Sequence, residues 1–211
     1  MSSHPLFPLD SPPTRVHRLE HTQAHTILDG RLYLSPALAA MDEEALRGDG
    51  ITHVLNTAKD VPTQQFESIK VLHLQIYDSP EQILPFEQAA CFIAESLAKG
   101  GKCLVHCVAG QSRSASVVIY FLMTQGYSLK ETFSYVKERK PDIRLNFGFA
   151  SQLEDSERRL HGGKSTLDMT EYKVDSLLEI LEGSGKSRED VRETLRCFQG
   201  NAELALGALL D

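Results

Sequence analysis

The 211 residues contain no apolar run that approaches the roughly 20 residues of a membrane-spanning helix. The first 21 residues have no basic stretch followed by an apolar one, so no secretory signal is expected. The second residue is Ser2, where N-myristoylation requires glycine, and the last four residues, ALLD, do not form a prenylation box. These absences predict a protein of the cytoplasm or the nucleus, with no membrane partner.

Positive charge is in short supply. The chain has 22 Lys and Arg residues against 29 Asp and Glu residues, a formal net charge of -7. Nucleic-acid binding without sequence preference needs a basic surface, and anionic lipid attracts basic segments. The composition therefore predicts that neither nucleic acid nor a membrane is a partner.

Cysteine is scarce as well. The four cysteines, Cys91, Cys103, Cys107 and Cys197, show no paired spacing of the kind that metal ligands have. In a reducing compartment they are expected to be free thiols. We therefore expect no metal site and no cofactor.

The chain does have enough apolar material for a core, at 41% hydrophobic and 24% charged residues. Composition and the positions of Gly and Pro residues divide the chain into four predicted parts. Residues 1–25, rich in Pro, Ser and His, are expected to form a flexible or loosely docked arm. Residues 26–160 form the main domain, residues 161–170 a linker, and residues 171–211 a small helical domain.

Apolar periodicity in the main domain alternates between strands and helices. Strands or hairpins are predicted over residues 27–36, 51–58, 70–77 and 102–107. Helices are predicted over residues 41–47, 85–99, 113–125, 129–140 and 147–160. Such alternation implies an α/β architecture in which a central sheet is flanked by helices.

The last 41 residues follow another pattern, in which short segments with apolar residues at helical spacing are separated by glycines. Three amphipathic helices are predicted, and their apolar positions are Val174, Leu177, Leu178 and Leu181, then Val191, Leu195 and Phe198, then Leu204, Leu206, Leu209 and Leu210.

The stretch that carries chemistry is residues 106–114, HCVAGQSRS, between a predicted strand and a long predicted helix. Backbone N–H groups in such a turn, together with the positive end of the helix, form a nest for oxyanions. The same field would stabilise the thiolate of Cys107, which makes it the candidate nucleophile. Arg113 follows six positions later and can grip two phosphate oxygens.

Two other residues of the turn suit the same chemistry. Gly110 lets the backbone curl tightly or adopt positive φ. Ser114 can donate its hydroxyl to the thiolate when that group departs. The expected phosphate contacts come from the whole loop, which comprises Val108, Ala109, Gly110, Gln111, Ser112 and Arg113.

HCVAGQSRS matches every fixed position of the His-Cys-x-x-Gly-x-x-Arg-Ser signature, so the chain resembles the protein tyrosine phosphatase superfamily. The form of residues 109–115 is similar to that of the dual-specificity branch. Because only about 25 residues precede the catalytic region, the chain looks like a small "atypical" member of that branch. THVLNTA and RLNFGF resemble the family's second core strand and the start of a late helix. The resemblance implies a dual-specificity phosphatase fold over residues 26–160 and a cysteine-dependent, metal-independent activity.

Cleavage of a phosphate ester also needs a proton for the leaving oxygen. The resemblance implies an Asp on a loop before the cysteine, and Asp78 lies 29 residues before Cys107 and precedes Ser79 and Pro80. The alternative is that Asp78 only starts a turn, and Glu81 is the fallback acid. In the implied mechanism Cys107 forms a phosphocysteine, and Asp78 first donates a proton and then activates water.

The residues Val108 and Gln111 in the loop are uncharged, whereas relatives that hydrolyse inositol lipids often carry basic residues there. We therefore expect phosphoprotein substrates carrying phosphotyrosine and phosphoserine or phosphothreonine, with kinases of a signalling cascade among the partners. The alternative is a weakly active or inactive scaffold with the same fold that binds a kinase or a phosphoprotein.

The helical end has a resemblance of its own. Residues 191–210 resemble the second half of a ubiquitin-associated or CUE domain, with Gly200–Asn201 before the third helix and Leu209–Leu210 at its end. Residues 183–187, GSGKS, depart from that pattern, because ubiquitin-associated domains usually present an apolar loop there. Ubiquitin or another protein is the implied partner, and a helical tail that packs on the main domain is the alternative.

Two further expectations concern side chains near the loop. His106 is expected to orient the loop through hydrogen bonds. Cys91 and Cys103 either fill the core or form a protective disulfide with Cys107 under oxidation.

Overall fold

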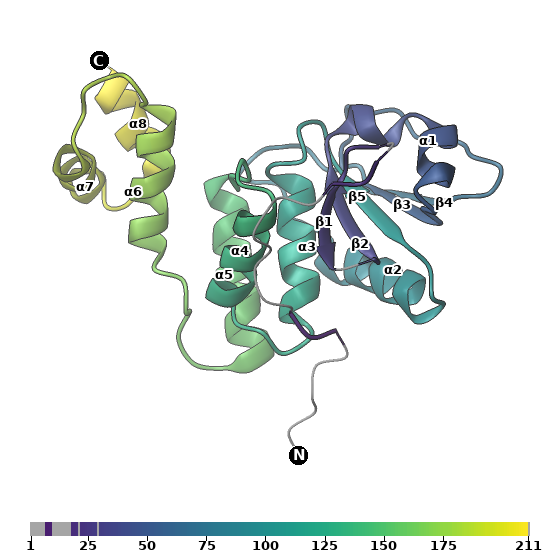
Figure 1. Cartoon of the computed structure of the whole chain (residues 1–211). Coiled ribbons are helices and arrows are strands. Elements are labelled where there is room, and N and C mark those ends of the chain that lie inside the picture. The colour runs from purple at the N-terminus through teal and green to yellow at the C-terminus, as the bar shows by residue number, and fades with distance from the viewer. Residues whose placement is uncertain (1–6, 10–17, 21, 29, 211) are drawn as a thin grey trace. The chain divides into compact units, whose positions relative to one another are not determined.

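The structure is a computed structural model that describes residues 7–9, 18–20, 22–28 and 30–210. Its contacts divide the chain into two compact units, Met1–Ser165 and Thr166–Asp211. Each unit has its own core and is described by itself (Figure 1).

The first unit is built on one five-stranded sheet with the order β1-β2-β5-β3-β4. β1 pairs antiparallel with β2, and the other neighbours pair parallel. The strands are β1 (His25–Leu28), β2 (Leu32–Ser35), β3 (His53–Asn56), β4 (Lys70–His73) and β5 (Cys103–His106). β5 is therefore the central strand, and all four parallel strands end on the same edge of the sheet.

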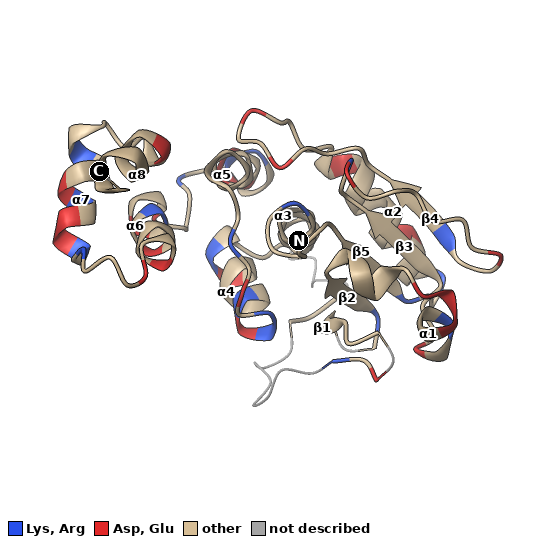
Figure 2. Ribbon diagram, turned by 90° about the horizontal axis from the view of Figure 1, so that it is seen from above, with Lys and Arg blue, Asp and Glu red and all other residues tan. Residues whose placement is uncertain are grey.

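Helices cover both faces of this sheet. Figure 2 shows α1 on one side and α2 and α3 on the other. The helical elements are the 3-10 helix η1 (Ala37–Ala40) and the α-helices α1 (Glu43–Gly48), α2 (Phe86–Ala98), α3 (Arg113–Met123), α4 (Leu129–Arg139) and α5 (Phe147–His161). The predicted central sheet flanked by helices is thus confirmed.

Alternation along the strands assigns side chains to the two faces. Tyr33, Val54 and Leu104 pack into a core with Ala40 and Leu46, on the α1 side. The residues between them, such as Leu34, Leu55 and Val105, are fully buried on the opposite side. There α3 packs on β2 and β5, and every residue of α3 is buried because α2, α4 and α5 surround it.

The strand predicted over residues 70–77 is wrong in its second half. β4 ends at His73 because its partner β3 ends at Asn56, whose carbonyl accepts the Leu74 N–H at 2.8 Å. Residues 74–77 belong to no strand: the Ile76 N–H donates to the Leu74 carbonyl at 2.9 Å, which closes a tight turn, and the Ile76 carbonyl accepts the Lys59 N–H at 3.1 Å. Leu74 and Ile76 are nevertheless buried, so their alternation reports burial rather than strand pairing.

Part of the N-terminal arm is docked on the first unit. The Leu9 N–H donates to the Tyr127 hydroxyl at 2.8 Å, and the rings of Phe7 and Phe121 lie 6.0 Å apart. The N–H and hydroxyl of Thr22 both donate to the Asp49 carboxylate. These contacts attach the described parts of residues 1–25, and the remainder of the predicted arm lies outside the described residues.

The second unit consists of the three predicted helices, α6 (Met169–Ile180), α7 (Arg188–Cys197) and α8 (Ala202–Leu210). All three pack on one another. Its fully buried apolar side chains come from each helix and include Val174, Leu177, Val191, Leu195, Ala205 and Leu209. An ion-pair network on the surface joins Arg188 and Arg192 of α7 to Glu171 of α6.

Within the described residues, no helix combines the length and the apolar character needed to span a bilayer. In the same residues, no three side chains of His, Cys, Asp or Glu gather in a way that would hold a metal ion. All four cysteines are free thiols.

Candidate active site

Residues 107–112, which we call the phosphate loop, connect the end of β5 to the start of α3. The loop lies at the carboxyl edge of the parallel strands, where open α/β sheets bind their ligands. Cys107 is only 1% exposed and packs among Ala37, Ala58 and Val61, which follow the neighbouring strands β2 and β3.

The Cys107 sulfur accepts two hydrogen bonds. The Gly110 backbone N–H and the Ser114 hydroxyl both donate to Sγ at 3.2 Å. Hydrogen bonds to the charged form of a group favour that form. The structure thus brings Gly110 and Ser114, two of the residues that the sequence placed around the candidate nucleophile, into contact with its sulfur.

The curvature of the phosphate loop depends on Gly110. Its φ is +71°, and a Cβ at this position would lie 2.5 Å from the Ser35 carbonyl oxygen. Two residues before Gly110, the Val108 carbonyl accepts the Ala37 N–H at 2.9 Å. The loop therefore packs directly on the backbone at the end of β2, and only glycine fits at the point of closest approach.

Arg113 opens α3, and its side chain is only 5% exposed. Its Nη1 donates to the Asp60 carboxylate at 2.5 Å and to the Ile76 carbonyl at 3.1 Å. Its Nε is a buried donor without a hydrogen-bond acceptor among the described residues, although the Asp78 carboxylate lies 3.5 Å away. A buried donor without an acceptor is costly, and a phosphate oxygen would satisfy it.

Asp78 lies on the segment of residues 74–84, which we call the acid loop. Its Oδ1 accepts hydrogen bonds from the Ser112 hydroxyl at 2.9 Å and from the Asn146 side-chain amide at 2.8 Å. Tertiary structure thus carries Asp78 from the end of β4 to the phosphate loop. Glu81, the alternative acid, is exposed and hydrogen-bonded to Ser79, and no described contact joins it to the phosphate loop.

The first turns of α5 hold the acid loop in place. Asn146 caps α5 by accepting the Phe149 N–H at 2.9 Å while its amide donates to Asp78. A Cβ on Gly148 would overlap the Pro80 backbone, with the Pro80 Cα only 2.5 Å away. Further along α5, Gln152 accepts the Leu84 N–H and donates to the Gln82 carbonyl, both at 2.9 Å.

Sequence reasoning missed Asn146, Gln152 and Asp60 as residues of the site. The RLNFGF stretch indicated the start of a helix but not its contact with Asp78. Asp60, after β3, is 62% exposed, and the hydrogen bond from Arg113 lowers the pKa of its carboxyl. No local pattern marks Asp60, because its partner lies 53 residues away.

The predicted phosphate contacts divide by the direction of their side chains. Ser112 donates to Asp78, and Gln111 donates to Asp142 at 3.2 Å, which in turn binds Lys140. Both side chains are engaged beside the loop, so the backbone N–H is the group that Gln111 and Ser112 offer to an oxyanion. Val108 is 43% exposed and lies on the outer rim of the loop.

His106, the last residue of β5, directly precedes the phosphate loop and is only 2% exposed. Its Nδ1 lies 3.2 Å from the Cys107 carbonyl oxygen, and its own carbonyl accepts both the N–H and the hydroxyl of Thr57. Burial lowers the pKa of His106 to about 4, so the ring is neutral near pH 7. This arrangement suits the orienting role that the sequence suggested.

A disulfide between Cys103 and Cys107 does not fit the fold. Cys103 begins β5, four residues before Cys107, and is fully buried. At about 3.3 Å per residue the two Cα atoms are about 13 Å apart, whereas a disulfide needs less than about 7 Å. Cys103 fills the core, as one of the two interpretations of the sequence had it. The same interpretation is wrong for Cys91, which is exposed on α2.

With this geometry in hand, comparison with known proteins identifies the family. The family described as "Dual specificity phosphatase, catalytic domain" matches residues 32–159, more than half of the chain. The chain belongs to the dual specificity phosphatase family. The match contains the whole sheet except β1 and every residue of the site described above, and it ends before the Thr166–Asp211 unit.

Two curated relatives show how far the similarity extends. Dual specificity protein phosphatase Mpk3 of Drosophila melanogaster is 41% identical over 139 residues, which cover 64% of this chain but only 34% of Mpk3. Human dual specificity protein phosphatase 14 is 38% identical over 155 residues, which cover 72% of this chain and 77% of that protein. The chain thus spans about a third of one relative and most of the other.

Solved structures agree. The crystal structure of human DUSP28 is 33% identical, covers 65% of this chain and 94% of its own, and gives a TM-score of 0.61. A mouse putative dual specificity phosphatase complexed with zinc tungstate is 29% identical, covers 70% of this chain and 94% of its own, and gives a TM-score of 0.63.

Proposed function

We propose that the chain is an active cysteine-dependent phosphatase that hydrolyses phosphotyrosine and phosphoserine or phosphothreonine in proteins without a metal ion. The observation that carries the proposal is the surrounding of Cys107. Its sulfur accepts two hydrogen bonds, and the buried Nε of Arg113, the first residue of the helix that follows the loop, lacks an acceptor that a phosphate oxygen would supply.

In the first step the Cys107 thiolate attacks phosphorus and the bond to the leaving oxygen breaks. Asp78, held at the phosphate loop by Ser112 and Asn146, gives its proton to that oxygen. The product is a phosphocysteine. Backbone N–H groups of the loop and the Arg113 guanidinium stabilise the charge on the phosphoryl oxygens.

In the second step Asp78 takes a proton from water as that water attacks phosphorus, and the sulfur–phosphorus bond breaks. The Ser114 hydroxyl, 3.2 Å from Sγ, stabilises the departing thiolate. Inorganic phosphate leaves, and Asp78 is protonated again for the next cycle.

Phosphoproteins are the proposed substrates because the loop offers no basic side chain other than Arg113, and signalling kinases are candidate partners. The mouse relative is described as complexed with zinc tungstate, and tungstate is a tetrahedral oxyanion, as phosphate is. The cytoplasm or the nucleus is the proposed location.

The ubiquitin-associated character of residues 171–211 stays a prediction. The short helices α6, α7 and α8 agree with it. The loop at residues 183–187 is fully exposed and presents no apolar side chain, which favours a protein partner other than ubiquitin. Titration of isotopically labelled ubiquitin with the full chain, followed by chemical shifts, tests this partner directly.

Hydrolysis of p-nitrophenyl phosphate in the presence of a chelator tests the catalytic proposal. We expect turnover by the wild type, a loss of about 10⁴-fold or more in Cys107→Ser, and a loss of about 10²- to 10⁴-fold in Asp78→Asn. The loss of activity in Asp78→Asn should be larger on a phosphoserine peptide, because a serine oxygen leaves less readily than p-nitrophenolate unless it is protonated.

Two outcomes would contradict the proposal. The first is turnover that persists in Cys107→Ser. The second is a wild type without cysteine-dependent activity on either the aryl phosphate or phosphopeptides, which would leave a phosphoprotein-binding scaffold.

A further inference from the structure

A surface hollow of about 1040 Å³ adjoins the phosphate loop on the side away from the acid loop. It is lined by Ala109 of the phosphate loop, by residues of η1 and of the start of α1, and by Arg18, His25 and Lys140. Because Ala37 of η1 donates to the Val108 carbonyl, the phosphate loop and this hollow share one wall. Ala109 therefore belongs both to the loop that would hold the phosphate and to the hollow.

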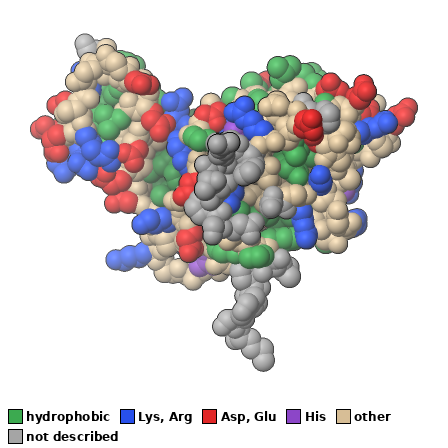
Figure 3. All heavy atoms as spheres, viewed as in Figure 1, with side chains coloured by type: hydrophobic (Ala, Val, Ile, Leu, Met, Phe, Trp, Pro, Cys, Tyr) green, Lys and Arg blue, Asp and Glu red, His purple; other side chains and the backbone are tan. Residues whose placement is uncertain are grey.

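Exposed apolar side chains gather around the same loop. The first unit has six exposed large hydrophobic residues among those described: Leu38, Met41, Tyr77, Ile83, Val108 and Leu160. All but Leu160 lie on the phosphate loop, the acid loop, or the segment of residues 38–41. Figure 3 shows hydrophobic side chains exposed along the upper edge of this unit.

Two of these residues lie in the hollow. Leu38 is 81% exposed and Met41 is 44% exposed, and both line it. Their exposure costs free energy that burial by a partner would recover, and exposed apolar patches commonly mark binding surfaces. A surface of this kind beside a catalytic loop suits an apolar side chain of the substrate.

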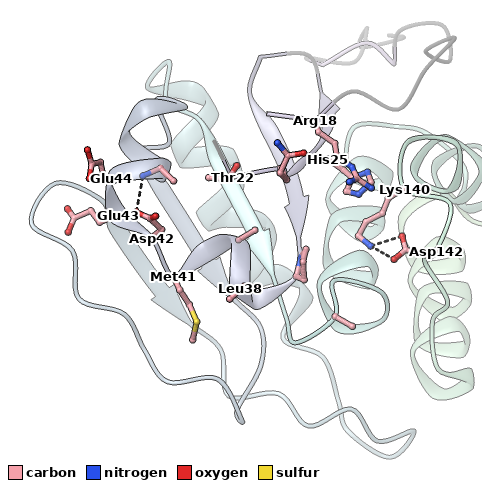
Figure 4. A pocket seen from close by; sticks show the side chains of 15 residues that line it. Arg18, Thr22, His25, Leu38, Met41, Asp42, Glu43, Glu44, Lys140 and Asp142 are labelled. Carbon is pink, nitrogen blue, oxygen red and sulfur yellow. Dashed lines mark hydrogen bonds and ion pairs between the residues drawn. The ribbon is translucent and has the colours of Figure 1, made fainter. Parts of the chain in front are cut away.

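The two sides of the hollow differ in charge. Figure 4 shows Asp42, Glu43 and Glu44 at the start of α1 on one side, and Arg18, His25 and Lys140 on the other. On the basic side, Lys140 is only 2% exposed and is neutralised by Asp142 at 2.7 Å. The acidic side carries three carboxylates.

The three carboxylates differ in their hydrogen bonds. Asp42 caps α1 through the Ala45 N–H, and Glu43 accepts the Glu67 N–H at 3.2 Å. Glu44 is exposed, and no described residue bonds to its carboxylate. Its charge is therefore available to a basic group of a ligand that lies in the hollow.

We propose that this hollow binds the substrate polypeptide next to its phosphorylated residue and selects an apolar residue at Leu38 and Met41 and a Lys or Arg residue at Asp42, Glu43 and Glu44. The proposal rests on the proposed function, and it names the sequence class of the phosphoprotein substrate. It makes Glu44 and Leu38 specificity-determining residues. They are not catalytic residues, because no described contact joins either of them to Cys107, Arg113 or Asp78.

A set of phosphopeptides tests the charge selection. Each peptide carries Lys, Glu or Leu at one position within four residues of the phosphorylated residue, on an alanine background. We expect kcat/KM to be about 3- to 10-fold higher for Lys than for Glu at one or more positions, as one exposed ion pair provides. Glu44→Lys should abolish or reverse this preference.

Glu95→Lys is the control for the change of charge, because Glu95 is an exposed residue of α2 that does not line the hollow and its reversal changes the net charge equally, with the loss of its surface ion pair with Lys70. It should keep the wild-type preference. Leu38→Asp should remove a preference for Leu, and Leu160→Asp, at the far end of α5, should not. Rates on p-nitrophenyl phosphate should be the same in all four variants and the wild type.

Binding separates this proposal from the catalytic one. Affinities of the same peptides for Cys107→Ser, with and without Glu44→Lys, are measured by fluorescence anisotropy and do not depend on turnover. A wild type that lacks cysteine-dependent turnover while Cys107→Ser binds Lys peptides preferentially would refute the catalytic proposal alone. Equal use of Lys and Glu peptides, or a preference that survives Glu44→Lys, would overturn the assignment of the hollow.

A second copy of the chain is the other occupant that the apolar rim would suit. Sedimentation equilibrium of the wild type and Leu38→Asp decides this point. We expect both to be monomeric. A wild-type dimer that Leu38→Asp dissociates would overturn the assignment of the hollow to substrate.

Discussion

The phosphate loop and the acid loop are the two walls of one site, but they are held in different ways. The phosphate loop is fixed by its own backbone, through its connections to β5 and α3 and the close approach of Gly110 to Ser35. The acid loop is fixed by side chains that arrive from α5, such as Asn146 and Gln152.

This difference separates two chemical tasks. In the proposed mechanism, activation of Cys107 needs only donors that are close in sequence, so it should survive damage elsewhere. In the same mechanism, protonation of the leaving oxygen needs Asp78 at a definite place, which depends on a helix 68 residues away in the chain. The two walls should therefore fail independently, and each prediction below concerns one of them.

The largest effect is expected for Gly110→Ala in the phosphate loop. The new Cβ would lie 2.5 Å from the Ser35 carbonyl oxygen at a φ of +71°, so the loop must deform. We expect kcat/KM on p-nitrophenyl phosphate to fall at least about 100-fold, which corresponds to about 2.7 kcal/mol. Phosphate should also no longer protect Cys107 from alkylation.

Gly126→Ala is the control for this variant. Gly126 also has a positive φ, +99°, but no atom lies within 4 Å of its Cβ position. It should lose a similar amount of stability without a comparable loss of activity. Equal activity losses in both variants would show that backbone strain, and not loop geometry, explains the result.

A pH effect on stability is expected from His106, below the phosphate loop. Burial lowers its folded-state pKa to about 4, whereas in the unfolded chain it is about 6.5. Between these values only the unfolded state takes up the proton, so stability falls as pH falls from about 6.5 towards 4. By pH 5 the loss from this group is about 2 kcal/mol.

Urea unfolding at pH 7 and pH 5 measures this effect. The stability difference between the two pH values should be about 2 kcal/mol smaller in His106→Gln than in the wild type. His161→Gln, a change at an exposed histidine, should keep the wild-type difference. An unchanged pH dependence in His106→Gln would rule out burial of a neutral ring.

Gly148→Ala should damage the acid loop alone. Its Cβ would overlap the Pro80 backbone and push Asp78 away from the phosphate loop. We expect kcat to fall about 10- to 30-fold, since misplacing a general acid removes part of its contribution. Alkylation of Cys107 by iodoacetamide near pH 6, and its protection by phosphate, should stay as in the wild type. A parallel loss of alkylation would show that the two walls are coupled.

The smallest effect is expected for Asn146→Ala, which removes one of two hydrogen bonds to Asp78. The kcat should fall about 5- to 10-fold, the equivalent of about 1 kcal/mol. The variant also loses the cap of α5, at about 1 kcal/mol of stability.

Asn146→Ser distinguishes these two consequences, because serine can cap a helix but is too short to reach Asp78 as the amide does. It should recover the melting temperature and not the rate. Recovery of both would mean that Asn146 acts only through the helix.

Prediction from sequence succeeded where the information is local. The strand–loop–helix at residues 103–123 follows from an apolar strand, a glycine turn and an apolar helix, and it contains Cys107, Gly110, Arg113 and Ser114 together. The three helices of the second unit followed from periodicity in the same way. The predicted end of β4 was wrong because the buried residues just beyond the strand continue the same apolar alternation as the paired strand.

The proposed nucleophile and its nest could be identified from local sequence alone, because a strand, a tight turn and a helix N-terminus place these groups within nine consecutive residues. The partner of each group across the site came from the tertiary structure. Asp60 meets Arg113, and Asn146 meets Asp78, over separations of 53 and 68 residues. Such pairs depend on how the sheet and α5 pack, and no local pattern of residues encodes that packing.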